Sequence, residues 1–110
     1  MNDELKQLIK DAAKLLFGEV EDRGTTDKPI FVTPNGFFNP LDPERGDLMK
    51  VAEAAGLSLE LDLGCVFINR SKAEEFSIPD HFVFTPNDHQ SLALAILRAA
   101  SAVYKSREGV

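Results

Sequence analysis

Several residue types and segments that mark particular classes of protein are scarce or missing in this sequence. It contains one cysteine in 110 residues, and no tryptophan. A single cysteine cannot close an internal disulfide, which excludes a disulfide-framed secreted module. No apolar run approaches the ~20 residues of a transmembrane helix. The acidic start, residues 1–4, is followed by no apolar signal-peptide core, so we expect a soluble, cytoplasmic protein.

Positive charge is also scarce. Twelve Lys and Arg stand against 18 Asp and Glu, for a net charge of −6. Phosphate contacts dominate affinity for nucleic acids, so we expect neither nucleic-acid binding nor binding to anionic membranes. Residues 1–22 hold six acids and three bases, residues 41–62 hold six acids and two bases, and residues 98–110 carry a net charge of +2. The two acidic segments have two interpretations: solubility with a favourable helix dipole, or an acidic face for a basic partner.

Nucleotide-binding motifs are absent as well. The sequence contains neither G-x-G-x-x-G nor G-x-x-x-x-G-K-[ST]. We therefore predict no nucleotide cofactor, and no other cofactor is indicated.

The periodicity of apolar residues predicts three helices. Residues 3–17 repeat apolar side chains at helical spacing, and residues 88–106 do the same with many alanines, which allow close packing on a sheet or another helix. Asp42 opens a predicted helix over residues 42–55, with Asp47 as a competing cap one turn later.

The same analysis predicts four strands. They are residues 30–33, 57–62, 65–68 and 82–84, and a turn at Leu63 and Gly64 makes the second and third an antiparallel hairpin. Residues 19–28 are polar and predict a linker. The predicted fold is α+β in a single domain, residues 1–110, with a small antiparallel or mixed sheet of three or four strands and three helices in the order α-β-α-β-β-β-α.

We expect one core between the sheet and the C-terminal helix, formed by Leu59, Leu61, Val66, Ile68, Val83, Leu92, Ile96 and Val103. Two of the strands are apolar on both faces, so the sheet should be covered on a second face. We expect the N-terminal helix to provide that cover, in its own chain or in a second copy, which would make a homodimer.

Part of the sequence resembles a known type of protein. The blocks that carry the resemblance are Phe38-Asn39-Pro40-Leu41, Gly46-Asp47-Leu48 and Ala95-Ile96-Leu97-Arg98-Ala99-Ala100. Over residues 38–104 the chain is similar to small uncharacterised bacteriophage and prophage proteins of the phage α/β/α sandwich domain type, although Leu48 replaces the usual small residue. The resemblance brings no catalytic residues, and it implies a phage or prophage accessory protein in the bacterial cytoplasm.

The predicted order of elements from residue 42 onward is also that of a double-stranded-RNA-binding domain. Such domains bind phosphates with lysines at the start of their last helix. Here residues 86–90 read Pro-Asn-Asp-His-Gln, with an acid and no Lys or Arg. The topology is compatible with that domain, and the activity is not.

Few residues have the chemistry for catalysis or metal binding. Asp80-His81 and Asp88-His89 lie on either side of a predicted strand, too far apart for one metal ion unless the loops fold back. We expect loop and capping roles for them, and a core position for Cys65. If a site exists, its candidates are Cys65, His81, His89 and Asp88, with a Cys65–His81 pair as the enzymatic alternative.

Three functions follow from these observations. The first is a non-enzymatic accessory protein that binds a protein partner. The second is an acidic mimic of nucleic acid that inhibits a host protein, and the third is an enzyme of unrecognised type that uses Cys65 and a histidine. No catalytic, cofactor-binding or metal-ligating set is predicted.

Overall fold

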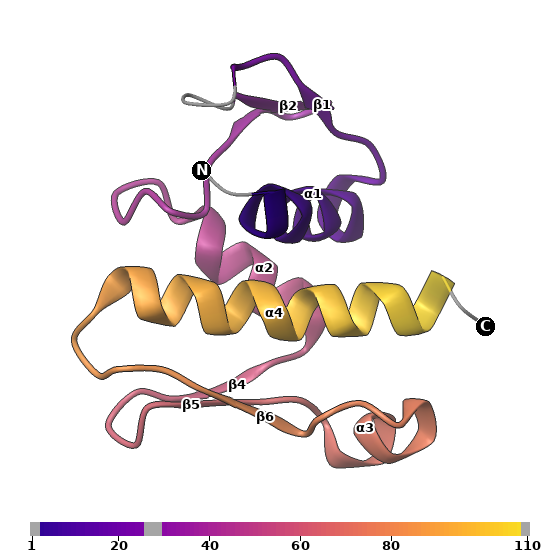
Figure 1. Ribbon diagram of the computed structural model, residues 1–110, viewed down its shortest axis with the longest axis vertical. Helices are drawn as coiled ribbons and strands as arrows, with labels where there is room; N and C mark the ends of the chain where they lie inside the picture. The colour runs from indigo at the N-terminus through magenta and orange to yellow at the C-terminus, as the bar shows by residue number, and fades with distance from the viewer. Residues whose placement is uncertain (1–2, 26–29, 109–110) are drawn as a thin grey trace.

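The computed structural model describes residues 3–25 and 30–108 and has an α+β architecture (Figure 1). The described part contains four helices and six short strands. In chain order they are α1 (Asp3–Phe17), β1 (Glu21–Asp22), β2 (Phe31–Thr33), β3 (Gly36–Phe38), α2 (Asp47–Ala55), β4 (Ser58–Glu60), β5 (Cys65–Phe67), α3 (Arg70–Phe76), β6 (His81–Val83) and α4 (His89–Glu108).

Helices α1, α2 and α4 form the middle of the molecule, with one small antiparallel sheet on each side, and α3 lies beside the second sheet. In Figure 1, α4 and α2 lie in the centre of the molecule. β1 and β2 lie on one side of them, beyond α1, and β4, β5 and β6 lie on the opposite side. The strand orders are β1-β2-β3 and β4-β5-β6. The predicted α+β class and the antiparallel hairpin are confirmed, but the strands belong to two sheets and the helices number four in the described residues.

Helix α4 is the centre of the hydrophobic core. It packs against α1, α2 and the second sheet, and Ile96 and Leu97 in its middle are fully buried. Alanines on both α1 and α4 are completely buried: Ala12, Ala13, Ala93, Ala99 and Ala100. These small side chains let the helix backbones approach closely, as the alanine content of residues 88–106 predicted.

A buried polar pair joins α1 to α4. The hydroxyl of Ser101 donates a hydrogen bond of 2.7 Å to the Asp11 carboxylate, and the Gln7 amide donates another of 2.9 Å. Asp11 and Ser101 are each 3% exposed. A carboxylate removed from water needs such partners, so the pair fixes how the two helices align.

The first sheet contains two strands that the sequence did not predict. β1 lies inside the predicted linker over residues 19–28, of which residues 26–28 are outside the described residues, and it pairs with β2. β3 follows the turn at Pro34 and Asn35 and pairs with β2 in the register Phe31↔Phe38. The Phe38 ring meets the Phe17 ring edge-on, at 5.9 Å between centroids, which attaches this sheet to the end of α1.

The second sheet is covered on one face only. Leu59, Val66 and Phe82 are neighbours across the three strands and form the row that faces α4. The alternate positions face away from the core, so Val83 is 71% exposed. Leu61 lies beyond the end of β4, in the turn that leads to β5, and is 54% exposed. Placing Val83 and Leu61 in the core was therefore wrong, because β6 points Phe82 inward and β4 ends before Leu61.

The N-terminal helix does not cover the outer face of this sheet. α1 packs against α4, α2 and β2, on the other side of the helical layer (Figure 1). The outer face carries Phe67 and Val83 with no element of the described chain over it. The prediction that α1 covers this face in its own chain was wrong, because α1 packs its apolar stripe against other helices. Cover by the helix of a second copy, in a homodimer, stays a prediction.

One helix begins later than predicted, and another was not predicted. α2 begins at Asp47, one turn after Asp42, and residues 43–45 form turns. Gly46 is the cap, in the left-handed conformation, and no side chain caps this helix. The polar segment from residue 70 to 80 contains α3, whose cap Asn69 accepts hydrogen bonds from the backbone N–H groups of Ser71 and Lys72.

Gly64 is required by a close backbone approach in the β4–β5 hairpin. It has φ +71°, and a Cβ atom at this position would collide with the backbone carbonyl of Phe84. The Phe84 N–H also donates a 2.8 Å hydrogen bond to the Gly64 carbonyl. Only glycine combines this φ with this close backbone approach.

Among the helices of the described residues, none has both the length and the apolar character of a membrane-spanning segment.

Candidate functional site

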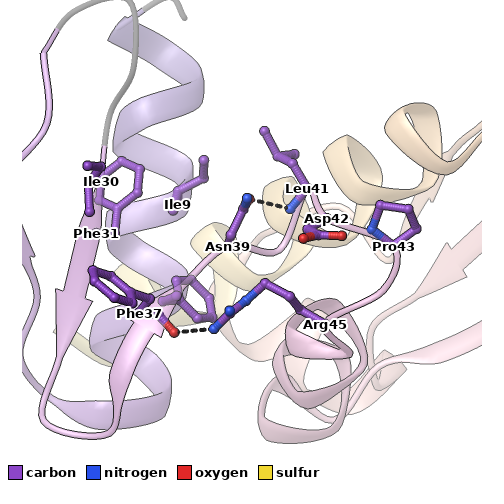
Figure 2. A pocket seen from close by; sticks show the side chains of 10 residues that line it. Ile9, Ile30, Phe31, Phe37, Asn39, Leu41, Asp42, Pro43 and Arg45 are labelled. Carbon is purple, nitrogen blue, oxygen red and sulfur yellow. Dashed lines mark hydrogen bonds between the residues drawn. The ribbon is translucent and has the colours of Figure 1, made fainter.

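An apolar groove lies between the β2–β3 hairpin and the loop that leads to α2. We call it the hairpin groove, and its volume is about 560 Å³. The described residues that line it are Ile9, Ile30, Phe31, Phe37, Phe38, Asn39, Leu41, Asp42, Pro43 and Arg45. Figure 2 shows the hairpin on one side, the loop on the other, and Ile9 of α1 between them.

The loop wall is held by hydrogen bonds between its own residues. The Asn39 side chain accepts a 3.1 Å bond from the Leu41 N–H (Figure 2). The Asp42 carboxylate accepts a 2.9 Å bond from the Glu44 N–H. Turns of this kind, in which an Asn or Asp side chain binds the backbone two residues on, hold a loop in one conformation.

Asp47 and Arg45 join the loop to the free edge of β3. One oxygen of Asp47 accepts bonds from the Asn39 N–H at 2.9 Å and from Nε of Arg45 at 2.8 Å. The Arg45 guanidinium also donates a 2.6 Å bond to the Phe37 carbonyl (Figure 2). Asp47 raises the pKa of Arg45 through their hydrogen bond. The pair closes an edge that another strand could otherwise join.

Phe37 stands at the mouth of the hairpin groove. Its side chain is 66% exposed, whereas its neighbours Phe31 and Phe38 are buried. Ile30, directly before β2, is also exposed. An aromatic and an aliphatic side chain are therefore held in water beside an apolar hollow, on a two-stranded hairpin that is fixed by its edge contacts. Such a surface can receive apolar side chains of another molecule.

The residues with catalytic chemistry lie elsewhere. Cys65 and His81 are on the outer face of the second sheet, on neighbouring strands. They are diagonal neighbours, because Cys65 pairs with Val83 and His81 pairs with Phe67; such positions are about 7–8 Å apart. The Cys65 thiol is directed to the Leu63 carbonyl at 3.9 Å, and Nδ1 of His81 lies 2.8 Å from the Asp80 carboxylate. His81 lowers the pKa of that carboxyl group through this hydrogen bond.

Asp88 and His89 form the start of α4. The Asp88 carboxylate accepts a 3.2 Å bond from the Ser91 N–H, which is a capping role. Nε2 of His89 is buried without a hydrogen-bond partner in the described part of the chain. The two histidines lie at opposite ends of the segment from β6 to α4. In residues 3–25 and 30–108, no group of three His, Cys, Asp or Glu side chains is placed to hold a metal ion.

Sequence reasoning missed the hairpin groove, because its walls come from α1, the β2–β3 hairpin and the loop before α2. The local sequence around the loop wall contained part of the information needed to find this groove. The block of residues 38–41 lies in the loop wall, and Phe37 directly before it adds a second aromatic residue to a segment that contains two prolines. Asn39 of this block holds the loop: its side chain accepts from the Leu41 N–H, and its backbone N–H donates to Asp47 of α2.

Comparison with known proteins adds no family to this picture. No family model, no curated protein and no solved structure matches the sequence. The resemblance to phage proteins, and the phage origin and bacterial cytoplasmic location that it implies, therefore stay predictions.

Proposed function

We propose that this protein is a non-enzymatic protein-binding module that receives apolar side chains of a partner in the hairpin groove. The observation that carries the proposal is the exposure of Phe37 at the mouth of an apolar hollow whose polar wall residues are already hydrogen-bonded to one another. Aromatic anchors beside such hollows dominate the energetics of many protein interfaces.

The chemistry of the groove supports binding over catalysis. Among the described residues that line it, only Asp42 and Arg45 are ionisable. Both are used to hold the loop, Asp42 through the Glu44 N–H and Arg45 through Asp47. A nucleophile beside a general base, which covalent catalysis requires, is not found in this lining.

The mode of binding follows from the closed edge of β3. A partner that added a strand would compete with the Arg45 guanidinium for the Phe37 carbonyl. We therefore propose that side chains, and not backbone hydrogen bonds, fill the groove. Two or three apolar side chains of a partner segment match a hollow of about 560 Å³.

Selection of peptides from a random library on the purified protein tests this proposal. Selected peptides should share two or three closely spaced apolar residues, and they should lose binding to Phe37→Ser while the variant keeps its circular dichroism spectrum and melting temperature. Val83→Ser is the matched control, because Val83 is equally exposed but lies on the other sheet. Peptides that bind Phe37→Ser as well as the unchanged protein, or a selection that enriches nothing, would contradict the proposal.

Salt dependence separates this proposal from the alternative of an acidic nucleic-acid mimic. Burial of apolar side chains is insensitive to sodium chloride or strengthened by it, whereas pairing of exposed charges is screened. The selected peptides should bind equally well at low and high salt. A partner that is lost steeply as salt rises, and that binds Phe37→Ser normally, would favour the mimic.

A further inference from the structure

A second groove, between α3 and α4, combines an apolar floor with a basic rim. We call it the α3–α4 groove. It consists of two adjoining hollows of about 160 and 470 Å³, which share Phe76, Ile78 and Ser106 in their lining. Other apolar residues of the lining are Leu8, Pro79, Phe82, Ala102 and Val103. In Figure 1, α3 and the yellow, C-terminal half of α4 lie at the same end of the molecule.

Among the described residues, four cationic side chains and one acidic side chain line this groove. Lys72 and Arg107 line the smaller hollow, with Glu75 as the acid, and Arg98 and Lys105 line the larger one. The whole chain carries a net charge of −6. One third of its 12 Lys and Arg residues therefore gather at one apolar hollow of an acidic protein.

Three of these cations have no ion-pair partner in the described part of the chain: Lys72, Lys105 and Arg107. The fourth, Arg98, lies 3.6 Å from the Glu4 carboxylate, and both of those side chains are well exposed. The dipole of α4 accounts for basic residues in its last turn, Lys105 and Arg107. It does not account for Arg98, two turns earlier, or for Lys72, which belongs to a different helix.

We propose that the α3–α4 groove binds an acidic amphipathic helix of a partner protein, with apolar residues of that helix on Phe76 and Ile78 and its carboxylates on the basic rim. On α4, Arg98 and Lys105 lie two turns apart on one face, about 10 Å at 1.5 Å per residue, which matches about two turns of a bound helix. Lys72 and Arg107 line the adjoining smaller hollow. The site is distinct from the hairpin groove and does not depend on it.

The charges favour this occupant over two others. Cations spread along two turns of helix suit several carboxylates, whereas a single fatty acid offers one. An anionic membrane would be repelled by the rest of a chain with net charge −6. A second copy of this chain would have to bring an acidic segment to the groove, and its test is the molecular mass of the purified protein.

The experiment uses a fluorescent helical peptide of about twelve residues, about 18 Å long, with Leu and Phe on one face and Glu beside them. A peptide of the same pattern with Lys in place of Glu is the control ligand. Fluorescence anisotropy should show saturable binding of the acidic peptide, with affinity at least about tenfold higher than for the basic peptide, and the affinity should fall as salt rises.

The variant Lys72→Glu with Lys105→Glu should lose at least about tenfold in affinity for the acidic peptide, because the charge of the rim is reversed on both α3 and α4. Lys14→Glu with Lys50→Glu is the matched control: both lysines are exposed, neither lines the α3–α4 groove, and the net charge changes equally. Circular dichroism checks that both variants fold. Lys72→Arg with Lys105→Arg, which keeps both positive charges, should bind the acidic peptide as the unchanged protein does. Phe37→Ser should also leave the affinity for this peptide unchanged.

Three results would overturn the proposal. One is equal binding of the acidic and basic peptides, or no saturable binding of either. Another is an equal loss in the Lys14/Lys50 control, which would show a net-charge effect. The third is cosedimentation with phosphatidylglycerol vesicles, or dimerisation by light scattering, that depends on Lys72 and Lys105 while the peptide does not bind.

Discussion

Removal of the Ser101 hydroxyl tests how much the buried contact between α1 and α4 stabilises the fold. In Ser101→Ala, the Asp11 carboxylate stays 3% exposed but loses its 2.7 Å hydrogen bond. A hydrogen bond to a carboxylate contributes about 1.5–3 kcal/mol to the free energy of unfolding. The higher helix propensity of alanine returns about 0.5 kcal/mol. We therefore expect a net loss of about 1–2.5 kcal/mol.

The expected change in melting temperature follows from the size of the chain. An unfolding entropy of about 2.1 cal/mol/K per residue makes 1 kcal/mol worth about 4 °C in a protein of 110 residues. Ser101→Ala should therefore melt about 4–10 °C below the unchanged protein. Urea titration should show a lower midpoint at an unchanged slope. Ser71→Ala, an exposed helical serine, is the control and should change stability little.

A double-mutant cycle identifies the bond itself. In Asp11→Ala with Ser101→Ala, neither side chain is left without its partner, so the double variant should lose less stability than the two single variants together. We expect a coupling free energy of about 1–2 kcal/mol between the two positions. Additive losses, or a Ser101→Ala variant that melts like the unchanged protein, would refute the assignment of a stabilising role to this pair.

Three further predictions concern the hairpin turn, an ion pair and the orphaned histidine. Gly64→Ala should lose about 3 kcal/mol or more in free energy of unfolding, measured by urea titration, because positive φ and a backbone collision combine. Gly56→Ala, at a position with similar φ and open space around it, should lose only about 1–2 kcal/mol. Equal losses in the two variants would contradict the collision. Lys6 lies 3.0 Å from Asp22 and lowers the pKa of that carboxyl group below 3.8, so Lys6→Gln should melt below the unchanged protein at neutral pH. This difference in melting temperature should vanish as the pH falls through the lowered pKa of Asp22. A difference that persists at lower pH would contradict the prediction. His89→Leu should leave the melting temperature unchanged or raise it, because Nε2 is buried without a partner, and a clear drop would show that the imidazole makes a stabilising contact.

The elements that the sequence predicted well are those that local patterns specify. The helix over residues 3–17 has the same bounds in the structure, because an apolar stripe runs along it and Gly18, with φ +78°, ends it. The hairpin around Gly64 was predicted for the same reason: alternating residues lead into a compact turn. These features need only contacts between residues close in the chain.

Short strands and helix bounds were decided by contacts beyond the local sequence. β1 and β3 are two and three residues long, too short to show a period of two, and they exist because β2 pairs with both. α2 begins at Asp47 because that carboxylate binds Asn39 and Arg45 while residues 43–45 turn to reach it. Asp42, a good cap by sequence, is used in the turn.

The sequence by itself determined the α+β class, the main helices and the antiparallel hairpin, because periodicity and turn residues act locally. Only the tertiary structure decided which face of each strand is buried, as Val83 shows, and which helices α1 covers. Both grooves belong to this second kind. The hairpin groove joins Ile9 to Leu41, and the α3–α4 groove joins Lys72 to Lys105; residues so far apart in the chain meet only when the helical layer and the two sheets pack together.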